Sequence, residues 1–315
     1  MNLRSFVRWN VLAGVAAAAY MLYESQWLRR VEQPLTVEGL PPGLEGLTIL
    51  HLSDVHAGQP GLNLWTFERA VRWAETCRPD LMVLTGDILG GRSAWDRCLR
   101  LLARLRAPLG VYVVAGNHEY GISKNPLTHA PEPIPWEKAG VTLLHDSCVT
   151  LDVPSTRHET EAEGARPCAV TICGADYVSG GRPLLHMPPP TADLAILLIH
   201  RPPKDDDPLA SIFHLAFAGH THGGQIRVPT PWGLRSPHNE GFPRLEGVYP
   251  WGRGQLAISA GIGTTFLPFR LLTRPQAVLY RLETTDRGGM LEDASGIYGE
   301  LGRPTDAGGG ADANG

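Results

Sequence analysis

Short apolar runs of strand length recur along the middle of the chain, separated by longer segments with helical spacing. The five strongest runs cover residues 47–52, 81–84, 111–115, 194–199 and 215–218. They are rich in Val, Ile and Leu at adjacent positions, as strands buried on both faces are. Between the first three runs lie apolar patterns of helical period at 64–77 and 94–105. This order of strands and helices predicts a mainly parallel α/β core.

Weaker patterns complete the folded region. Further strands are expected at residues 141–144, 148–153, 169–173, 255–259 and 277–282, with a polar Glu-rich loop at 154–167. A proline-bearing linker at 33–46 opens the globular part, so we expect one domain over 33–285. Residues 286–315 are rich in Gly, Asp and Ala. We expect them to form a disordered tail without a role in chemistry.

An uninterrupted apolar run from Val11 to Tyr23, flanked by aromatic residues, marks the N-terminus. We expect residues 1–32 to form a hydrophobic helix that associates the protein with a membrane, the inner membrane if the source is Gram-negative. Arginines on both sides of the run leave the orientation open. A signal peptide with a small-residue site at 17–19 and a buried helix of the domain are the alternatives.

The composition excludes some classes of protein. The 315 residues carry 28 Lys and Arg against 32 Asp and Glu, a net charge of −4. Nothing in this balance indicates a nucleic-acid partner, which favours a basic surface. Five widely spaced cysteines form no C-x-x-C pair, which argues against a disulfide framework or a cysteine zinc site. One pair among Cys148, Cys168 and Cys173 remains open to oxidation outside the cytosol.

Polar residues follow every one of the five strong runs. In open α/β sheets, ligands bind beyond the carboxyl ends of the strands, so these residues are expected to meet at one edge. Their side chains offer carboxylate, amide and imidazole donors, which suit divalent ions such as Mn, Fe or Zn. The candidate metal ligands are Asp54, His56, Asp87, Asn117, His200, His220 and His222.

Taken one at a time, these motifs have ordinary structural explanations. G-D is common in turns, and a lone His200 is more often a buried structural histidine than a ligand. Their joint occurrence at five strand ends favours a metal centre. Two ions bridged by a carboxylate would hold an attacking hydroxide against a phosphoryl group and offset the developing charge. His118, next to Asn117, is the candidate proton donor to the leaving group.

The strings D-x-H, G-D, G-N-H-E, His and G-H-x-H, over roughly residues 47–280, resemble the calcineurin-like metallophosphoesterase superfamily. The fuller motifs at 52–56, 116–120 and 219–225 are similar to a subgroup of membrane-tethered bacterial phosphodiesterases, which includes a UDP-2,3-diacylglucosamine pyrophosphatase. The resemblance implies an α/β fold of two facing mixed β-sheets flanked by helices. Here that fold would follow an N-terminal hydrophobic helix.

The resemblance also implies roles for the candidate residues. Asp54, His56 and His222 would hold the first ion. Asn117, His200 and His220 would hold the second, with Asp87 bridging the two. His118, hydrogen-bonded to Glu119 or another acceptor, would protonate the leaving oxygen. The chain departs from the family's G-D-x-x-D at residue 90, which is Gly, and has Arg-Pro-Pro after His200 where Asn-Pro is more usual.

The resemblance implies a dinuclear hydrolase of phosphate esters or pyrophosphates, with a lipid-linked substrate such as UDP-2,3-diacylglucosamine as one option. A non-catalytic, metal-stabilised binding scaffold of the same fold is the alternative. Near the site, Arg227 and Arg270 are either phosphate contacts or, as we expect, solvated surface groups. Trp232 and Trp251 either line an apolar entrance or pack their loop.

Overall fold

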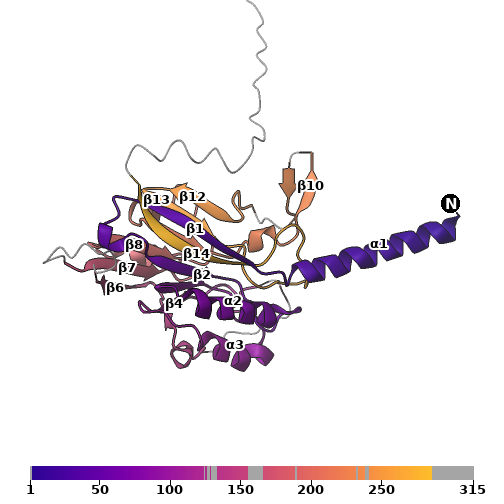
Figure 1. Cartoon of the computed structure of the whole chain (residues 1–315), viewed down its shortest axis with the longest axis horizontal. Coiled ribbons are helices and arrows are strands. Elements are labelled where there is room, and N and C mark those ends of the chain that lie inside the picture. The colour runs from indigo at the N-terminus through magenta and orange to yellow at the C-terminus, as the bar shows by residue number, and fades with distance from the viewer. Residues whose placement is uncertain are drawn as a thin grey trace, which may run out of the picture.

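The computed structural model describes residues 2–123, 125, 128, 133–154, 166–188, 190–231, 233–237 and 241–285. Two six-stranded mixed sheets face each other, preceded by a long helix (Figure 1). The predicted fold class is therefore confirmed. The expected disordered tail, 286–315, lies outside the described residues, as does most of the loop expected at 154–167.

The first sheet has the order β1-β14-β2-β3-β4-β5. Its strands are β1 (Arg29–Glu38), β2 (Thr48–Leu52), β3 (Leu81–Thr85), β4 (Val111–Val114), β5 (Thr142–Leu143) and β14 (Gln276–Thr285). Strands β2 to β5 are parallel, β14 is antiparallel to β2, and β1 is parallel to β14. The carboxyl ends of β2, β3 and β4 therefore lie at one edge, as predicted.

The second sheet has the order β12-β13-β9-β8-β7-β6. Its strands are β6 (Ser147–Val153), β7 (Cys168–Gly174), β8 (Leu194–Leu198), β9 (Leu215–Ala218), β12 (Gly247–Trp251) and β13 (Gly254–Ile258). The four inner strands are parallel and the two outer ones antiparallel. A small hairpin, β10 (Val228–Thr230) and β11 (Gly233–Arg235), stands apart from both sheets.

Three apolar layers hold the sheets together. Residues such as Val83 and Phe217 fill the space between the sheets, and both are fully buried. Helices α2 (Asn63–Cys77) and α3 (Trp95–Leu102) cover the outer face of the first sheet (Figure 1). The outer face of the second sheet is covered by short 3₁₀ turns. Those turns are η4 (Arg182–His186) and η5 (Pro208–Ser211). The described residues also form the 3₁₀ turns η1 (Pro42–Leu44), η2 (Arg92–Ala94), η3 (Trp136–Ala139) and η6 (His222–Gly224).

The prediction of a linker at 33–46 is wrong, because β1 occupies Arg29–Glu38 and enters the first sheet. Its residues alternate between exposed and half-buried or buried positions, the period of a strand. Pro34 obscured this pattern. A proline is tolerated here because β1 is an edge strand. On its solvent side there is no neighbouring strand to which a backbone N–H would donate.

Helix α1 (Leu3–Glu24) projects away from the body (Figure 1). It is long and apolar enough to cross a membrane, and its apolar window is not buried by the rest of the chain. The alternative of a buried helix of the domain is therefore wrong. Cys148 and Cys173 face each other across β6 and β7 and form a disulfide, while Cys168 is buried and free.

His51 on β2 lies between the sheets, fully buried against the rings of Phe217 and Tyr280. Its Nε2 lies 2.8 Å from the Thr85 hydroxyl, which in turn donates to Ser53. The hydroxyl's proton is thus already used, so the neutral Nε2–H form of His51 fits as donor. Burial lowers the pKa of His51 to about 3.

This lowered pKa predicts an acid-sensitive core. The unfolded chain takes up the His51 proton near pH 6.5 and the folded chain only near 3, so stability is lost as pH falls between these values, by about 1.4 kcal/mol per unit. We expect His51→Phe to flatten the pH dependence of the free energy of unfolding in this window. The exposed His186→Phe serves as control. Equal slopes in all three proteins would contradict the assignment.

Candidate metal centre

The predicted ligands lie in turns that directly follow strands of both sheets. Asp54 and His56 follow β2, Asp87 follows β3 and Asn117 follows β4. From the second sheet, His200 follows β8, and His220 and His222 follow β9. Because the parallel strands of the two facing sheets end at the same edge, these side chains converge although up to 168 residues separate them.

The backbone at these turns is strained. Among the described residues, ten that are not glycine have a positive φ, and five of them are candidate ligands: Asp54, His56, Asp87, His220 and His222. Left-handed conformations disfavour residues with a Cβ and persist where surrounding contacts enforce them. Such clusters mark functional sites, because a ligand aimed inward must often leave the ordinary backbone regions.

One group of donors combines the D-x-H motif, which carries Asp54 and His56, with His222 of the G-H-x-H motif. His56 Nε2 and His222 Nε2 face each other at 2.9 Å, and Asp54 Oδ1 lies 3.6 Å from the latter and 4.0 Å from the former. All three residues are buried. Burial is the main reason why the pKa values of both histidines fall well below their usual value. The imidazoles therefore stay neutral, the form that binds metal.

A second group lies beside it. His200 Nε2 lies 3.2 Å from Asn117 Oδ1, 3.1 Å from His220 Nδ1 and 3.4 Å from Asp87 Oδ2. The same Asp87 oxygen is 3.5 Å from His56 Nε2 in the first group. Asp87 thus stands between the two groups, and its Oδ1 is occupied by the backbone N–H of His118.

These distances fit metal coordination. Ligand atoms about 2.0–2.1 Å from one zinc-like ion lie about 3.3–3.4 Å apart along the edge of a tetrahedron.

The carboxylates also need compensating charge. Burial raises the pKa of Asp54 to about 6. For Asp87 burial acts in the same direction, but attraction to His200, His118 and His56 outweighs it and lowers the pKa well below its usual value. Cations at this place would supply that charge.

Several backbone contacts orient the donors. The Thr85 carbonyl lies 2.7 Å from His200 Nδ1, which fixes Nε2 as the inward nitrogen. The Asn117 amide nitrogen donates to the Ile122 carbonyl, which turns Oδ1 toward His200. The donor set is therefore held before any ion binds.

His118 lies beside the first group, and its Nε2 is close enough to donor atoms of His56 and Asp87 for the three to hold an ion together. Its ring meets the ring of His56 edge-on with centroids 4.4 Å apart, and its Nε2 lies 4.0 Å from Asp87 Oδ2. Its Nδ1 contacts the Thr128 hydroxyl at 3.1 Å. Of the two predicted options, Glu119 or another group, the partner of the ring is therefore Thr128 and not Glu119.

Glu119 instead serves the backbone. Its two carboxylate oxygens accept four buried N–H groups at 2.8–2.9 Å, those of Asp87, Ile88, Leu89 and Gly116. Burial is the main cause that raises the pKa of Glu119 to about 7. The carboxylate ties the turn that carries Asp87 to the turn that carries Asn117. It also supports the loop in which Gly90 stands where the motif commonly has a second acid.

Arg270 is also a structural group, and the prediction of a solvated arginine is wrong. Its side chain is fully buried. Its guanidinium donates to the carbonyls of His222, Ala260, Gly261, Gly263 and Thr273. No local pattern in the sequence reveals this role, because the acceptors are backbone groups that the fold gathers. Arg227 is half-buried and pairs with Glu246.

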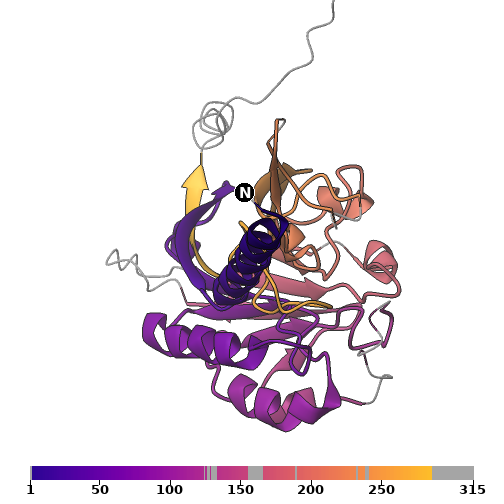
Figure 2. The ribbon, with the colours of Figure 1, turned by 90° about the vertical axis from the view of Figure 1, so that its right-hand side faces the viewer.

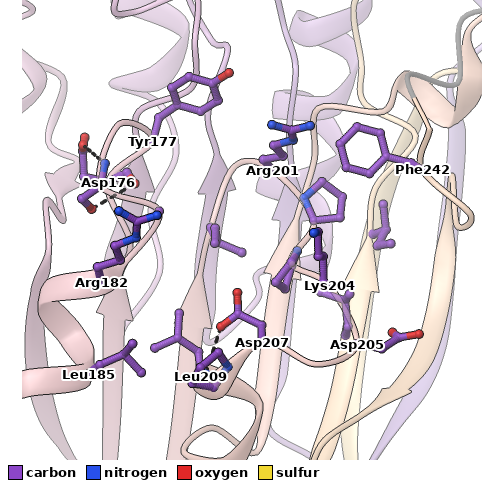
Figure 3. Close-up of a pocket in the computed structure, with 18 of the residues that line it drawn as sticks. Asp176, Tyr177, Arg182, Leu185, Arg201, Lys204, Asp205, Asp207, Leu209 and Phe242 are labelled. Carbon is purple, nitrogen blue, oxygen red and sulfur yellow. Dashed lines mark hydrogen bonds between the residues drawn. The ribbon is translucent and has the colours of Figure 1, made fainter.

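Figure 3 shows a hollow of about 1000 Å³, and two of its lining residues contact ligands of the second group. Tyr177 contacts the ring of His200, with centroids 5.8 Å apart. Phe242 contacts the ring of His220 at 5.6 Å and also carries the guanidinium of Arg201 over its face. Two aromatic rings thus connect the hollow to the donors.

The lining of this hollow has free positive charge. Arg182, Arg201 and Lys204 form no ion pair with another described residue. The three acidic side chains of the lining have partners. Asp205 pairs with Arg244, Asp207 caps η5, and Asp176 accepts the Tyr120 hydroxyl and two backbone N–H groups. The hollow therefore suits a negatively charged group. Trp251, the last residue of β12, is buried in the apolar layer on the outer face of the second sheet, while Trp232 lies outside the described residues.

Comparison with known proteins points to one family. The model of the calcineurin-like phosphoesterases matches residues 47–224. The metallophosphoesterase YkuE of Bacillus subtilis (strain 168) is 26% identical over 284 residues, 87% of this chain and 91% of its own. Phosphodiesterase YaeI of Escherichia coli (strain K12) is 26% identical over 244 residues, 74% of this chain and 81% of its own. UDP-2,3-diacylglucosamine pyrophosphatase LpxG of Chlamydia muridarum is 32% identical over only 79 residues, 24% of each chain.

The contacts of Glu119 lead to a prediction. In Glu119→Gln, an amide nitrogen replaces one oxygen and faces two backbone N–H donors. We expect a loss of about 1–3 kcal/mol in the free energy of unfolding, the cost of unsatisfied buried groups. Metal content measured by elemental analysis should fall with it, because Asp87 and Asn117 lose their support. Glu75→Gln, at an exposed ion pair, is the control. Unchanged stability and metal content would contradict this role.

Proposed function

The chain belongs to the calcineurin-like phosphoesterase family and is a metal-dependent phosphoester hydrolase, and we propose that it works with two divalent ions of the Mn, Fe or Zn type. The observation that carries the proposal is the position of Asp87 Oδ2, 3.5 Å from His56 Nε2 in one donor group and 3.4 Å from His200 Nε2 in the other. A single oxygen between two donor groups is the arrangement that a bridging carboxylate needs.

The proposed ligand assignment follows the two donor groups. Asp54, His56 and His222 hold the first ion, Asn117, His200 and His220 hold the second, and Asp87 bridges them. When bound, such ions lower the pKa of water and offset negative charge on a phosphoryl group. The chain itself supplies a buried, preformed frame, which keeps the phosphoryl group in line with the attacking oxygen.

His118 supplies the proton in this proposal. Thr128 holds its Nδ1, which leaves Nε2 directed at the donor groups, 4.0 Å from Asp87 Oδ2. Burial lowers the pKa of His118, while the charge of Asp87 acts in the opposite direction. A proton on Nε2 can pass to the departing oxygen once a substrate lies between the ring and the donor groups.

The substrate is proposed from the hollow beside the second group. Arg182, Arg201 and Lys204 suit a second phosphate, and the aromatic faces of Tyr177 and Phe242 suit a flat or apolar group. A nucleotide-linked pyrophosphate such as UDP-2,3-diacylglucosamine has both features. The short similarity to a pyrophosphatase of that substrate supports this choice.

The location is part of the same proposal. Within residues 1–32, α1 anchors the protein in a membrane, the inner membrane if the source is Gram-negative; the catalytic domain, expected over 33–285, also includes the start of β1 at Arg29. The support is the length of α1, 22 residues, or about 33 Å at 1.5 Å per residue. This length matches a hydrocarbon core of about 30 Å. An apolar helix that the chain leaves uncovered has no stable place in water.

The dinuclear assignment is tested on full-length protein in detergent, stripped of metal and assayed with bis-p-nitrophenyl phosphate. We expect turnover to return with Mn²⁺ or a similar ion and to saturate at two ions per chain. Asp87→Asn should cut it by more than about 100-fold, beyond the loss typical of an outer-sphere partner. The exposed Asp206→Asn is the matched control. Full turnover with one ion per chain would contradict the proposal.

The role of His118 is tested by the leaving group. We expect His118→Ala to lower kcat by about 10²–10⁴ for a phosphodiester with an alcohol leaving group, which requires a proton. The loss should be much smaller for p-nitrophenolate, which departs unprotonated, and the metal content should not change. An equal loss for both substrates would assign His118 to binding rather than to proton transfer.

A further inference from the structure

The long helix leaves the body at the edge that carries the metal donors. Strand β1 begins at Arg29, shortly after α1, and runs parallel to β14. Strand β14 runs antiparallel to β2, so Val31, Val278 and His51 form one row across the sheet. The start of β1 therefore lies level with the carboxyl end of β2, with β14 between them, and β2 ends two residues before Asp54. Figure 2 looks onto this side, with α1 directed at the viewer.

Direct contacts fix the base of α1 to the loops of the metal centre. The backbone N–H of Arg270 donates to the Met21 carbonyl at 3.2 Å. The buried Glu24 carboxylate accepts the backbone N–H of Thr273 at 2.8 Å. Arg270 also holds the His222 carbonyl. The helix is thus joined through one loop, residues 264–275, to a candidate metal ligand.

Exposed apolar side chains surround this base, and we call them the apolar rim. Each is 42% to 52% exposed, and the rim consists of Trp27, Leu62, Trp65, Phe266, Leu267 and Leu272. Contacts connect its parts: Arg69 on α2 donates to the Gln26 carbonyl, and Thr264 donates to the Pro60 carbonyl. The rim is therefore one surface around the helix base, although its residues come from three parts of the chain.

Two features of the rim are not typical of a surface that faces water. Phe266 and Leu272 have positive φ values of 60° and 53°, a costly conformation for large side chains that here leaves them exposed. Arg274 and Arg69 lie over the indoles of Trp27 and Trp65, at 3.9 and 4.8 Å from the ring centroids. Arginine next to exposed tryptophan is characteristic of the interface between lipid headgroups and hydrocarbon.

We propose that the apolar rim rests on the surface of the bilayer that α1 enters, so that the metal centre opens at the level of the lipid headgroups. The inference rests on the membrane tether of the proposed function. Continuity with α1 selects a bilayer as the occupant, because a helix fixed at its base cannot enter the membrane without bringing the rim to it. The substrate class that follows is a phosphoester or pyrophosphate in the headgroup of a membrane lipid.

The test uses the full-length protein in vesicles of phosphatidylcholine and phosphatidylglycerol. A nitroxide is attached to Leu267→Cys, and to Leu143→Cys as the control. Leu143 is also exposed, but it lies on β5, five strands and about 24 Å away from β1. For each nitroxide, the rate of collision with oxygen, which concentrates in lipid, is compared with the rate of collision with a water-soluble nickel complex. We expect the label at 267 to favour oxygen severalfold more than the label at 143.

Vesicle flotation and bis-p-nitrophenyl phosphate turnover are measured in the same samples. Together with the labels, they show whether the rim inference, the membrane tether or the catalytic proposal is wrong. If the protein floats and is active but both labels favour nickel equally, the rim does not touch lipid and this inference fails alone. A label at 267 shielded from both reagents would mean that a second copy covers the rim, which also overturns it. If the protein does not float, the tether and this inference fail together, while metal-dependent turnover judges the catalytic proposal separately.

Discussion

The buried carboxylate of Asp87 is the group on which the rest of the site depends. One of its oxygens is held by a backbone N–H, and the other faces His56, His200 and His118 within 4.0 Å. A carboxylate in this position is stable only next to positive charge, which cations held by the surrounding residues would supply. The two sheets bring histidines from distant parts of the chain to that oxygen, and this arrangement explains why both carry their polar residues at the same edge.

The strained turns around Asp87 need their own support, because buried backbone groups must find hydrogen-bond partners. Two oppositely charged side chains provide it. Glu119 accepts four N–H groups on the side of the first sheet. Arg270 donates to five carbonyls near His222 and the loop after β13. Because that loop also holds the base of α1, the apolar helix and the candidate metal ligands share one structural element.

The sequence alone predicted the α/β class, and it named the candidate ligands that the structure brings together at one edge, because apolar runs followed by Asp, Asn or His are local patterns. The sequence did not reveal features whose structure depends on residues far away along the chain. Strand β1 was missed since Pro34 and alternating polar residues resemble a linker until β14 is placed beside them. The roles of Glu119 and Arg270 were missed for the same reason, because their partners are backbone groups gathered only by folding.

The central claim is that Asp87 bridges two ions. The most direct measurement is anomalous X-ray diffraction from crystals of the full-length protein loaded with Mn²⁺. The account predicts two peaks per chain, about 3.5–4 Å apart, with Asp87 Oδ2 between them. The Asp54, His56 and His222 donors should surround one peak, and those of Asn117, His200 and His220 the other. A single peak, or two peaks that do not share Asp87, would contradict it.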